Sequence, residues 1–210
     1  MTGKLQVVSF AAFVAVLLVS GLVLTTSRAA FTAQTVNDNN SFAAGSLALT
    51  HDAPTSARFN ASGWVPGDSA TECFDVTYSG DASSNSGVRL FAANLTDVDG
   101  AADAGAAATL SDDLDVVVDV YAAGETCATG VPTPTTVYTS GTPVGSDGTL
   151  GGFAADHTGY VDGIDPSWTP AGTPETRAFR IQVTLGADTA NDAQGDSATV
   201  DFVWEIQAGV

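Results

Sequence analysis

Short runs of alternating apolar and polar residues dominate the chain after residue 30, and no sustained apolar period of 3.6 residues accompanies them. Because successive side chains of a strand point to opposite faces, such runs predict half-buried β-strands. Turn residues such as Pro66-Gly67-Asp68 separate the runs, and glycine totals 22. We expect strands at 46–50, 70–78, 88–92, 114–121, 179–185 and 197–206.

The alternation also predicts which side chains form the core, and it sets Cys73 on the opposite face from its apolar neighbours. About seven to nine such strands are typical of a two-layered, antiparallel β-sandwich. Residues 141–172 are rich in Gly, Pro, Thr and Asp and are expected to be a long connection with short strands, and residues 101–110 at most a surface turn. The expected inward residues are Leu47, Leu49, Phe74, Val76, Tyr78, Leu114, Val116, Val118, Val120, Phe179, Ile181, Val183, Leu185, Val200, Phe202, Trp204 and Ile206.

An almost wholly apolar run precedes this region, from Val7 to Leu24, with Lys4 before it. A helix of about 18 residues is near the lower limit for crossing a bilayer. The small residues Ser27 and Ala29 suit the −3 and −1 subsites of a signal peptidase, so we expect cleavage between Ala29 and Ala30. The alternative is an uncleaved membrane anchor.

These boundaries predict a signal peptide over 1–29 and one β-sandwich domain over 30–210, whose residues 30–45 form an N-terminal strand segment and linker. The protein is then expected to be secreted, extracellular or at the cell surface. It would contact the membrane only through the leader before cleavage.

The chain of 210 residues carries a formal net charge of −18. Two of its six basic residues, Lys4 and Arg28, lie in the leader with none of the 24 acidic residues, so the exported part has four basic residues and a charge of −20. Phosphate backbones and anionic lipid would repel such a surface. Nucleic-acid binding is therefore not expected.

Cys73 and Cys127 are the two cysteines, and both fall in the exported part. In an oxidising compartment they most simply form one disulfide, which would close a loop of about 54 residues worth about 4 kcal/mol. Two reduced, buried thiols are the alternative. Their separation lacks the paired spacing of a zinc site.

No recognisable catalytic motif accompanies this pattern. The histidines, His51 and His157, form no His-Glu-x-x-His pair and are expected to be solvent-exposed loop residues. The sequence contains no Gly-x-Ser-x-Gly nucleophile motif. We therefore expect no enzyme activity and no catalytic residue.

Metal binding and glycosylation have weaker sequence signals. Asp97-Val98-Asp99-Gly100, with Asp103 nearby, resembles part of a calcium loop, but Ala108 stands where an EF-hand needs a bidentate Glu. We expect no cofactor or resident metal, with calcium as the alternative. Asn-x-Ser/Thr triplets begin at Asn39, Asn60 and Asn94 and are expected to be unmodified loop residues.

Several segments resemble the TasA/camelysin family of exported proteins. The junction Ala30-Phe31-Thr32-Ala33-Gln34-Thr35 is followed by an Asn-rich link and by Phe42-Ala43-Ala44-Gly45-Ser46-Leu47-Ala48-Leu49. The Val65-Pro66-Gly67-Asp68-Ser69 turn and the closing strand from Gln194 to Glu205 are also similar to family members. Residues 95–175 carry no such resemblance.

The resemblance implies a jelly-roll β-sandwich that polymerises into extracellular fibres of a biofilm matrix, after a SipW-type signal peptidase removes the leader. Such subunits self-associate by donating the N-terminal strand to the next copy, here through Phe31, Ala33 and Val36, with Phe31 as the anchor. Two alternatives are a camelysin-like cell-surface metallopeptidase, for which no zinc ligands are recognisable, and a monomeric cell-surface adhesin or binding module that uses 141–172 as its contact surface.

Overall fold

The computed structural model describes residues 32–35, 47–52, 59, 64–80, 85–100, 109–127, 133–190, 193 and 195–208. The chain divides into two units, Met1–Ala30 and Phe31–Val210, and all of the described residues belong to the second. The predicted signal peptide and its cleavage site at Ser27, Ala29 and Ala30 therefore lie outside the described residues.

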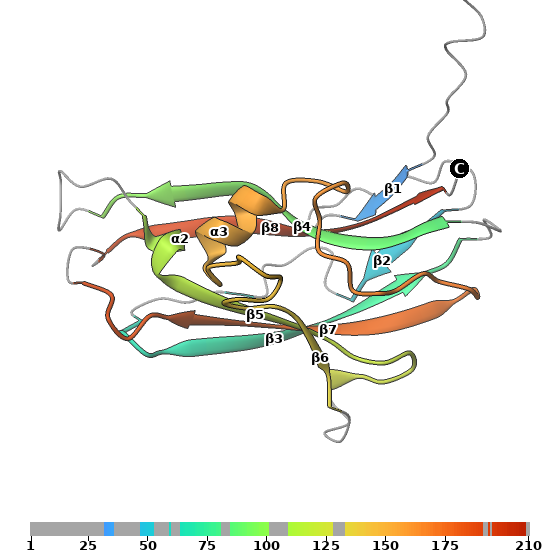
Figure 1. Ribbon diagram of the computed structural model, residues 1–210, viewed down its shortest axis with the longest axis horizontal. Coiled ribbons are helices and arrows are strands. Elements are labelled where there is room, and N and C mark those ends of the chain that lie inside the picture. The colour runs from blue at the N-terminus through green and yellow to red at the C-terminus, as the bar shows by residue number, and fades with distance from the viewer. Residues whose placement is uncertain are drawn as a thin grey trace, which may run out of the picture. The chain divides into compact units, whose positions relative to one another are not determined.

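Eight strands in the described ranges form two antiparallel sheets that face each other (Figure 1). The smaller sheet has the order β1-β8-β4 and consists of β1 (Thr32–Thr35), β8 (Ser197–Ala208) and β4 (Asn85–Val98). The larger sheet has the order β2-β3-β7-β5-β6 and consists of β2 (Leu49–His51), β3 (Ser69–Tyr78), β7 (Glu175–Leu185), β5 (Leu114–Val120) and β6 (Thr135–Tyr138).

The connections follow a jelly roll. From β3 to β5 the chain crosses from one sheet to the other at each step, and it does so again from β7 to β8. The last strand, β8, pairs with the first, β1. This order confirms the expected all-β, jelly-roll-like antiparallel β-sandwich.

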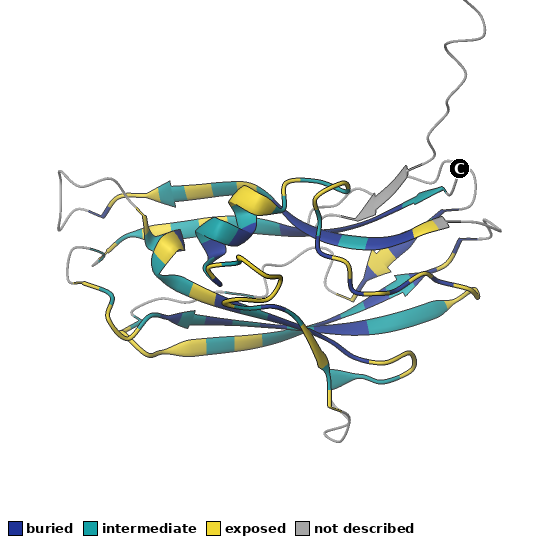
Figure 2. Cartoon of the chain, in the orientation of Figure 1, coloured by how far each residue is buried: buried dark blue, intermediate teal, exposed yellow. Residues whose placement is uncertain are grey.

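The predicted inward faces form the hydrophobic core between the sheets. Figure 2 shows the buried positions along the strands in dark blue. Trp204 of β8 lies at the centre of this core, with ring centroids 5.2 Å from Phe74 of β3 and 5.5 Å from Phe179 of β7. Leu114 and Val200 are only partly buried, because they lie toward the ends of their strands. The other predicted inward residues are all buried, which confirms the period-two interpretation.

The segment expected to be a long connection contains a helix, so that prediction is wrong for residues 150–156. The helix α3 (Leu150–Asp156) buries Leu150 and Phe153, and Thr149 caps it because its side-chain oxygen accepts a hydrogen bond from Gly152 N (3.0 Å). Two glycines give this stretch poor helix propensity. Burial of one helix face and the cap outweigh that cost. A second, short helix, α2 (Leu110–Asp113), leads into β5.

The outer edge of β4 is partly closed by the chain that follows α3. Val88 N donates to Trp168 O (2.8 Å), and Ala92 N donates to His157 O (2.9 Å). Between them, Leu90 and Ile164 exchange hydrogen bonds in both directions, at 3.1 and 2.8 Å. This irregular segment occupies the position of a fourth strand of the smaller sheet.

Candidate functional site

The seam between β1 and β8 is the part of the structure that bears on assembly. Four residue pairs face each other across it in antiparallel register: Thr32 with Gln207, Ala33 with Ile206, Gln34 with Glu205, and Thr35 with Trp204. β1 ends the strand order of its sheet, so only one of its sides is paired within the described residues. The N-terminal segment is thus an edge strand of its own subunit.

Of the three predicted donor residues, the structure describes only the backbone position of Ala33. It lies in β1, opposite Ile206. Phe31 and Val36 flank β1 in the sequence and lie outside the described residues. Thr32–Thr35 are extended as expected, and they pair with β8 of the same chain. Pairing of this segment with the edge of a neighbouring copy stays a prediction.

The β8 side of the seam belongs to the core. Trp204 and Ile206 are both 0% exposed and point between the sheets. His51 of β2 lies 5.9 Å from Trp204, measured between ring centroids, and is buried. The prediction of a solvent-exposed His51 is therefore wrong. His51 continues the alternation of Leu47 and Leu49, and this signal was available in the sequence.

Glu205 lies between these two core residues on β8 and points to the opposite face of the sheet. It is nevertheless only 7% exposed. Burial raises the pKa of its carboxyl group, and the hydrogen bond that Gln207 Nε2 donates to Oε1 (2.9 Å) offsets this in part. Its register neighbours are Gln34 in β1 and Arg89 in β4. A buried carboxyl group therefore lies at the seam, at a position that the alternation along β8 predicts to point away from the core.

Arg89 itself is engaged elsewhere. Its Nη1 forms an ion pair with Asp165 Oδ1 (2.6 Å), and its guanidinium carbon lies 6.0 Å from the ring centroid of Tyr160. The Tyr160 hydroxyl donates to Gly87 O (2.9 Å), and burial raises its pKa. The segment that closes the β4 edge is thus also held to this strand by side chains.

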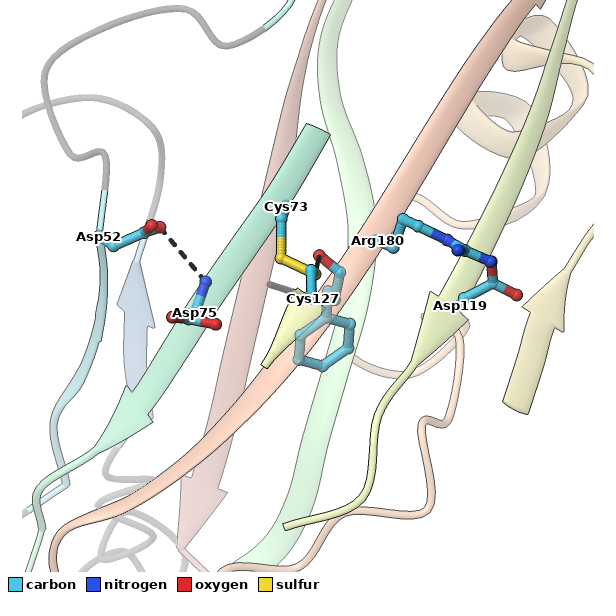
Figure 3. The surroundings of a disulfide bond; sticks show 7 residues. Asp52, Cys73, Asp75, Asp119, Cys127 and Arg180 are labelled. Carbon is cyan, nitrogen blue, oxygen red and sulfur yellow. Dashed lines mark hydrogen bonds and ion pairs between the residues drawn. A yellow bond between two sulfur atoms is a disulfide. The ribbon is translucent and has the colours of Figure 1, made fainter. Parts of the chain in front are cut away.

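The disulfide expected from the sequence is present, between Cys73 and Cys127 (Figure 3). The two Cα atoms are 6.1 Å apart, and Cys127 Sγ lies 3.8 Å from Phe179 O. Cys73 is in β3 and Cys127 lies in the segment that follows β5, so the bond ties this segment to β3. A disulfide is typical of proteins in an oxidising compartment.

Cys73 begins a row of residues that crosses the larger sheet. Arg180 of β7 lies opposite Cys73 on one side and Asp119 of β5 on the other (Figure 3). Arg180 donates from Nε (3.0 Å) and Nη2 (2.7 Å) to the same oxygen of Asp119, which raises the pKa of Arg180. Thr136 of β6 donates to the other oxygen (2.6 Å). The row joins four strands.

One acidic residue of the suggested calcium loop, Asp97, has hydrogen-bond partners within the protein. Asp97 accepts hydrogen bonds from Ser111 N (3.0 Å) and Ser111 Oγ (2.7 Å), and Gly100 N donates to Asp196 Oδ1 (2.7 Å). Asp103 and Ala108 lie outside the described residues. Within the described ranges, no three His, Cys, Asp or Glu side chains gather as metal ligands.

His157, the second histidine, is partly buried at the end of α3. Its ring centroid lies 5.2 Å from that of Phe153 and 5.8 Å from that of Tyr138. Its Nδ1 donates to Asp162 O (2.6 Å). His157 therefore has a packing role, and the expectation of a solvent-exposed loop residue is wrong here too.

No protein-family model matches the chain, and no curated protein sequence matches it significantly. In the ranges that the structure covers, no helix has the length and apolar character needed to cross a bilayer. A functional proposal for this protein therefore depends on the fold, on the pairing of β1 with β8 and on the disulfide.

Proposed function

We propose that this protein is a secreted structural subunit that assembles into extracellular fibres by exchange of its N-terminal strand. The observation that carries the proposal is the position of β1. It is a four-residue edge strand at the start of the sandwich unit, and among the described residues it pairs only with β8. In a second copy whose own β1 has left, the edge of β8 offers the same register to an incoming β1.

The free energy of strand pairing favours exchange of β1 between copies over a β8 edge that stays unpaired. When β1 leaves, β8 loses its main-chain partners from Trp204 to Gln207, and each such hydrogen bond is worth about 0.5–1.5 kcal/mol. A β1 strand from another copy restores the same bonds. Exchange of an identical element therefore has a small net free energy, as in domain swapping.

Protein concentration decides whether β1 docks on its own β8 or on the β8 of another copy. A strand tethered by a short linker has an effective concentration of about 1 mM or more at its own docking site. Intermolecular docking must compete with that value, or gain additional contacts between the sandwiches. Fibres are therefore expected to form only at high local concentration, as at a cell surface after export.

Export supplies the second part of the proposal. The leader would hold each chain at the membrane until a SipW-type peptidase cleaves it before Ala30, which then frees β1. The disulfide agrees with an oxidising exterior. Phe31 remains the proposed anchor of the donated strand. N-terminal sequencing of the secreted protein is expected to begin at Ala30.

A reversible lock on the seam tests strand exchange. Thr32 and Gln207 face each other in the register, so Thr32→Cys with Gln207→Cys places two thiols at opposite positions of neighbouring strands. Oxidation of the dilute monomer ties β1 to its own β8 and is expected to abolish fibres in electron micrographs. Oxidation after assembly at high concentration is expected to link neighbouring copies into a ladder on a non-reducing gel.

The matched control is Thr32→Cys with Gln207→Ser, which cannot form the cross-link and is expected to assemble like the parent. The proposal is wrong if the locked monomer forms fibres at the parental yield. It is equally wrong if oxidation of assembled protein yields cross-links within single copies only, or if the cleaved protein stays monomeric at every concentration.

A further inference from the structure

Asn94 begins the triplet Asn94-Leu95-Thr96, and it lies where β4 departs from regular pairing. The register between β4 and β8 shifts between Ala93 and Thr96, and Asn94 has a φ of 55°. The sequence-based expectation of a loop residue is wrong here, because Asn94 belongs to a strand. The triplet that an N-glycosylation enzyme could recognise therefore lies at an irregularity of the strand, where the backbone is locally kinked.

Both polar residues of the triplet are exposed. Figure 2 shows exposed and intermediate residues alternating along this end of β4. The segment that closes the β4 edge makes its last backbone contact at Ala92, and among the described residues no backbone bond continues it to Asn94. An enzyme can therefore approach the exposed Asn94 side chain from solvent.

Backbone geometry explains part of this pattern. Asparagine tolerates positive φ better than most residues, and Asn94 Nδ2 donates to Asp201 Oδ2 (2.8 Å). These two facts account for an asparagine at position 94 without any modification. They do not account for Thr96, whose hydroxyl makes, among the residues that the structure describes, only a long contact of 3.5 Å with Asn94 O. The threonine is the residue that completes an acceptor site for N-linked sugar.

We propose that Asn94 is an N-glycosylation site, filled after export, and this depends on the export part of the proposed function. The co-reactant is a saccharide linked to a polyprenyl phosphate or pyrophosphate. Asn94 Nδ2 forms a bond to the anomeric carbon, and the bond from that carbon to the phosphate oxygen breaks. The phosphate leaves with the electron pair, and the amide nitrogen loses one proton.

The sugar has a structural consequence for the sheet edge. Among the described residues, the closing segment makes no backbone hydrogen bond to Asn94–Val98; Asp97 of this stretch binds Ser111, and Val98 is exposed. An exposed strand edge is a site for unwanted pairing with other chains. A hydrophilic glycan on Asn94 blocks that edge, so that self-association is restricted to the β1 seam.

Mass spectrometry of the protein secreted by its own source cells tests the site. The Asn94 peptide is expected to carry a mass increment of one or more sugar residues, with the fragment ions placing it on Asn94. Thr96→Val, which keeps a β-branched residue in the strand, is expected to lose the increment completely. Thr96→Ser preserves the triplet and is expected to keep it.

Secreted wild-type protein whose Asn94 peptide has only its unmodified mass overturns the proposal, and so does an increment that survives in Thr96→Val. N-terminal sequencing of the same sample reports separately whether the leader has been cleaved. Failure of glycosylation is thereby distinguished from failure of export. Fibre formation is not used as a readout.

Discussion

Removal of the Cys73–Cys127 disulfide is expected to destabilise the protein by about 4 kcal/mol. The bond closes a loop with a sequence separation of 54 residues. Cross-linking a loop of this length removes about 14 cal/mol/K of entropy from the unfolded chain, or about 4 kcal/mol at 25 °C. For a domain of this size, that loss corresponds to a Tm lower by about 8–16 °C.

The double variant Cys73→Ala with Cys127→Ala is the perturbation, measured by thermal and urea unfolding. The folded state is expected to persist, because β3 still pairs with β7 along its whole length and Arg180, Asp119 and Thr136 still join β7, β5 and β6. The urea m-value should increase, since an unfolded chain without the cross-link exposes more surface. Wild-type protein in reductant is the control and should unfold at the same midpoint as the variant.

The entropic reasoning is refuted if the variant folds normally but loses less than about 1 kcal/mol with an unchanged m-value. Such a result would mean that the unfolded chain is already held compact by other contacts. A Tm for the reduced wild type far below that of the alanine variant would point instead to repulsion or strain from the free thiols.

Two further predictions concern buried charges. The Asp119 side chain is 6% exposed and that of Arg180 is 40% exposed. Arg180→Ala leaves a buried carboxylate without its cation and is expected to lower the free energy of unfolding by about 3 kcal/mol or more. Asp119→Ala leaves a half-exposed cation and is expected to lower it by only about 1 kcal/mol, both measured by urea unfolding. Equal costs, or the reverse order, would contradict the burial argument. Burial raises the pKa of Glu205, so the stability of the fold falls as pH rises from the ordinary pKa of a glutamate through the raised one. Glu205→Gln is therefore expected to raise Tm at pH 7 and to match wild type below about pH 4. A Glu205→Gln variant less stable than wild type at pH 7 would show that the carboxylate is stabilised by its surroundings.

The strands could be predicted because their signal is local. Alternation over five residues was enough to place Leu47, Leu49 and Val116 on buried faces. The same alternation extends to His51, which is buried. Its residue type alone predicts an exposed loop position, and here periodicity is the better guide.

Features that depend on tertiary contacts could not be predicted in the same way. The helix α3 contains Gly151 and Gly152 and forms because Phe153 packs against Tyr138 and Phe202, which are remote in sequence. Only the cap residue Thr149 was a local signal for it.

The candidate site was predictable in part. Composition and junction residues indicated an extended N-terminal segment, and this segment is a strand. Its partner edge was not predictable, since pairing of Thr32–Thr35 with residues near 205 depends on the whole jelly-roll order. The pairing of Arg180 with Asp119, which are 61 residues apart, depends in the same way on the register between two strands.

The length of chain between β1 and the buried Leu47 limits how far the donated strand can lie from its own sandwich. Twelve peptide units separate Thr35 from Leu47, and an extended chain covers at most about 3.3–3.6 Å per residue. The donated strand must therefore end within about 40 Å of its own sandwich. A filament built by exchange then has its subunits in close succession, and an axial repeat with wide gaps between neighbouring sandwiches is geometrically excluded.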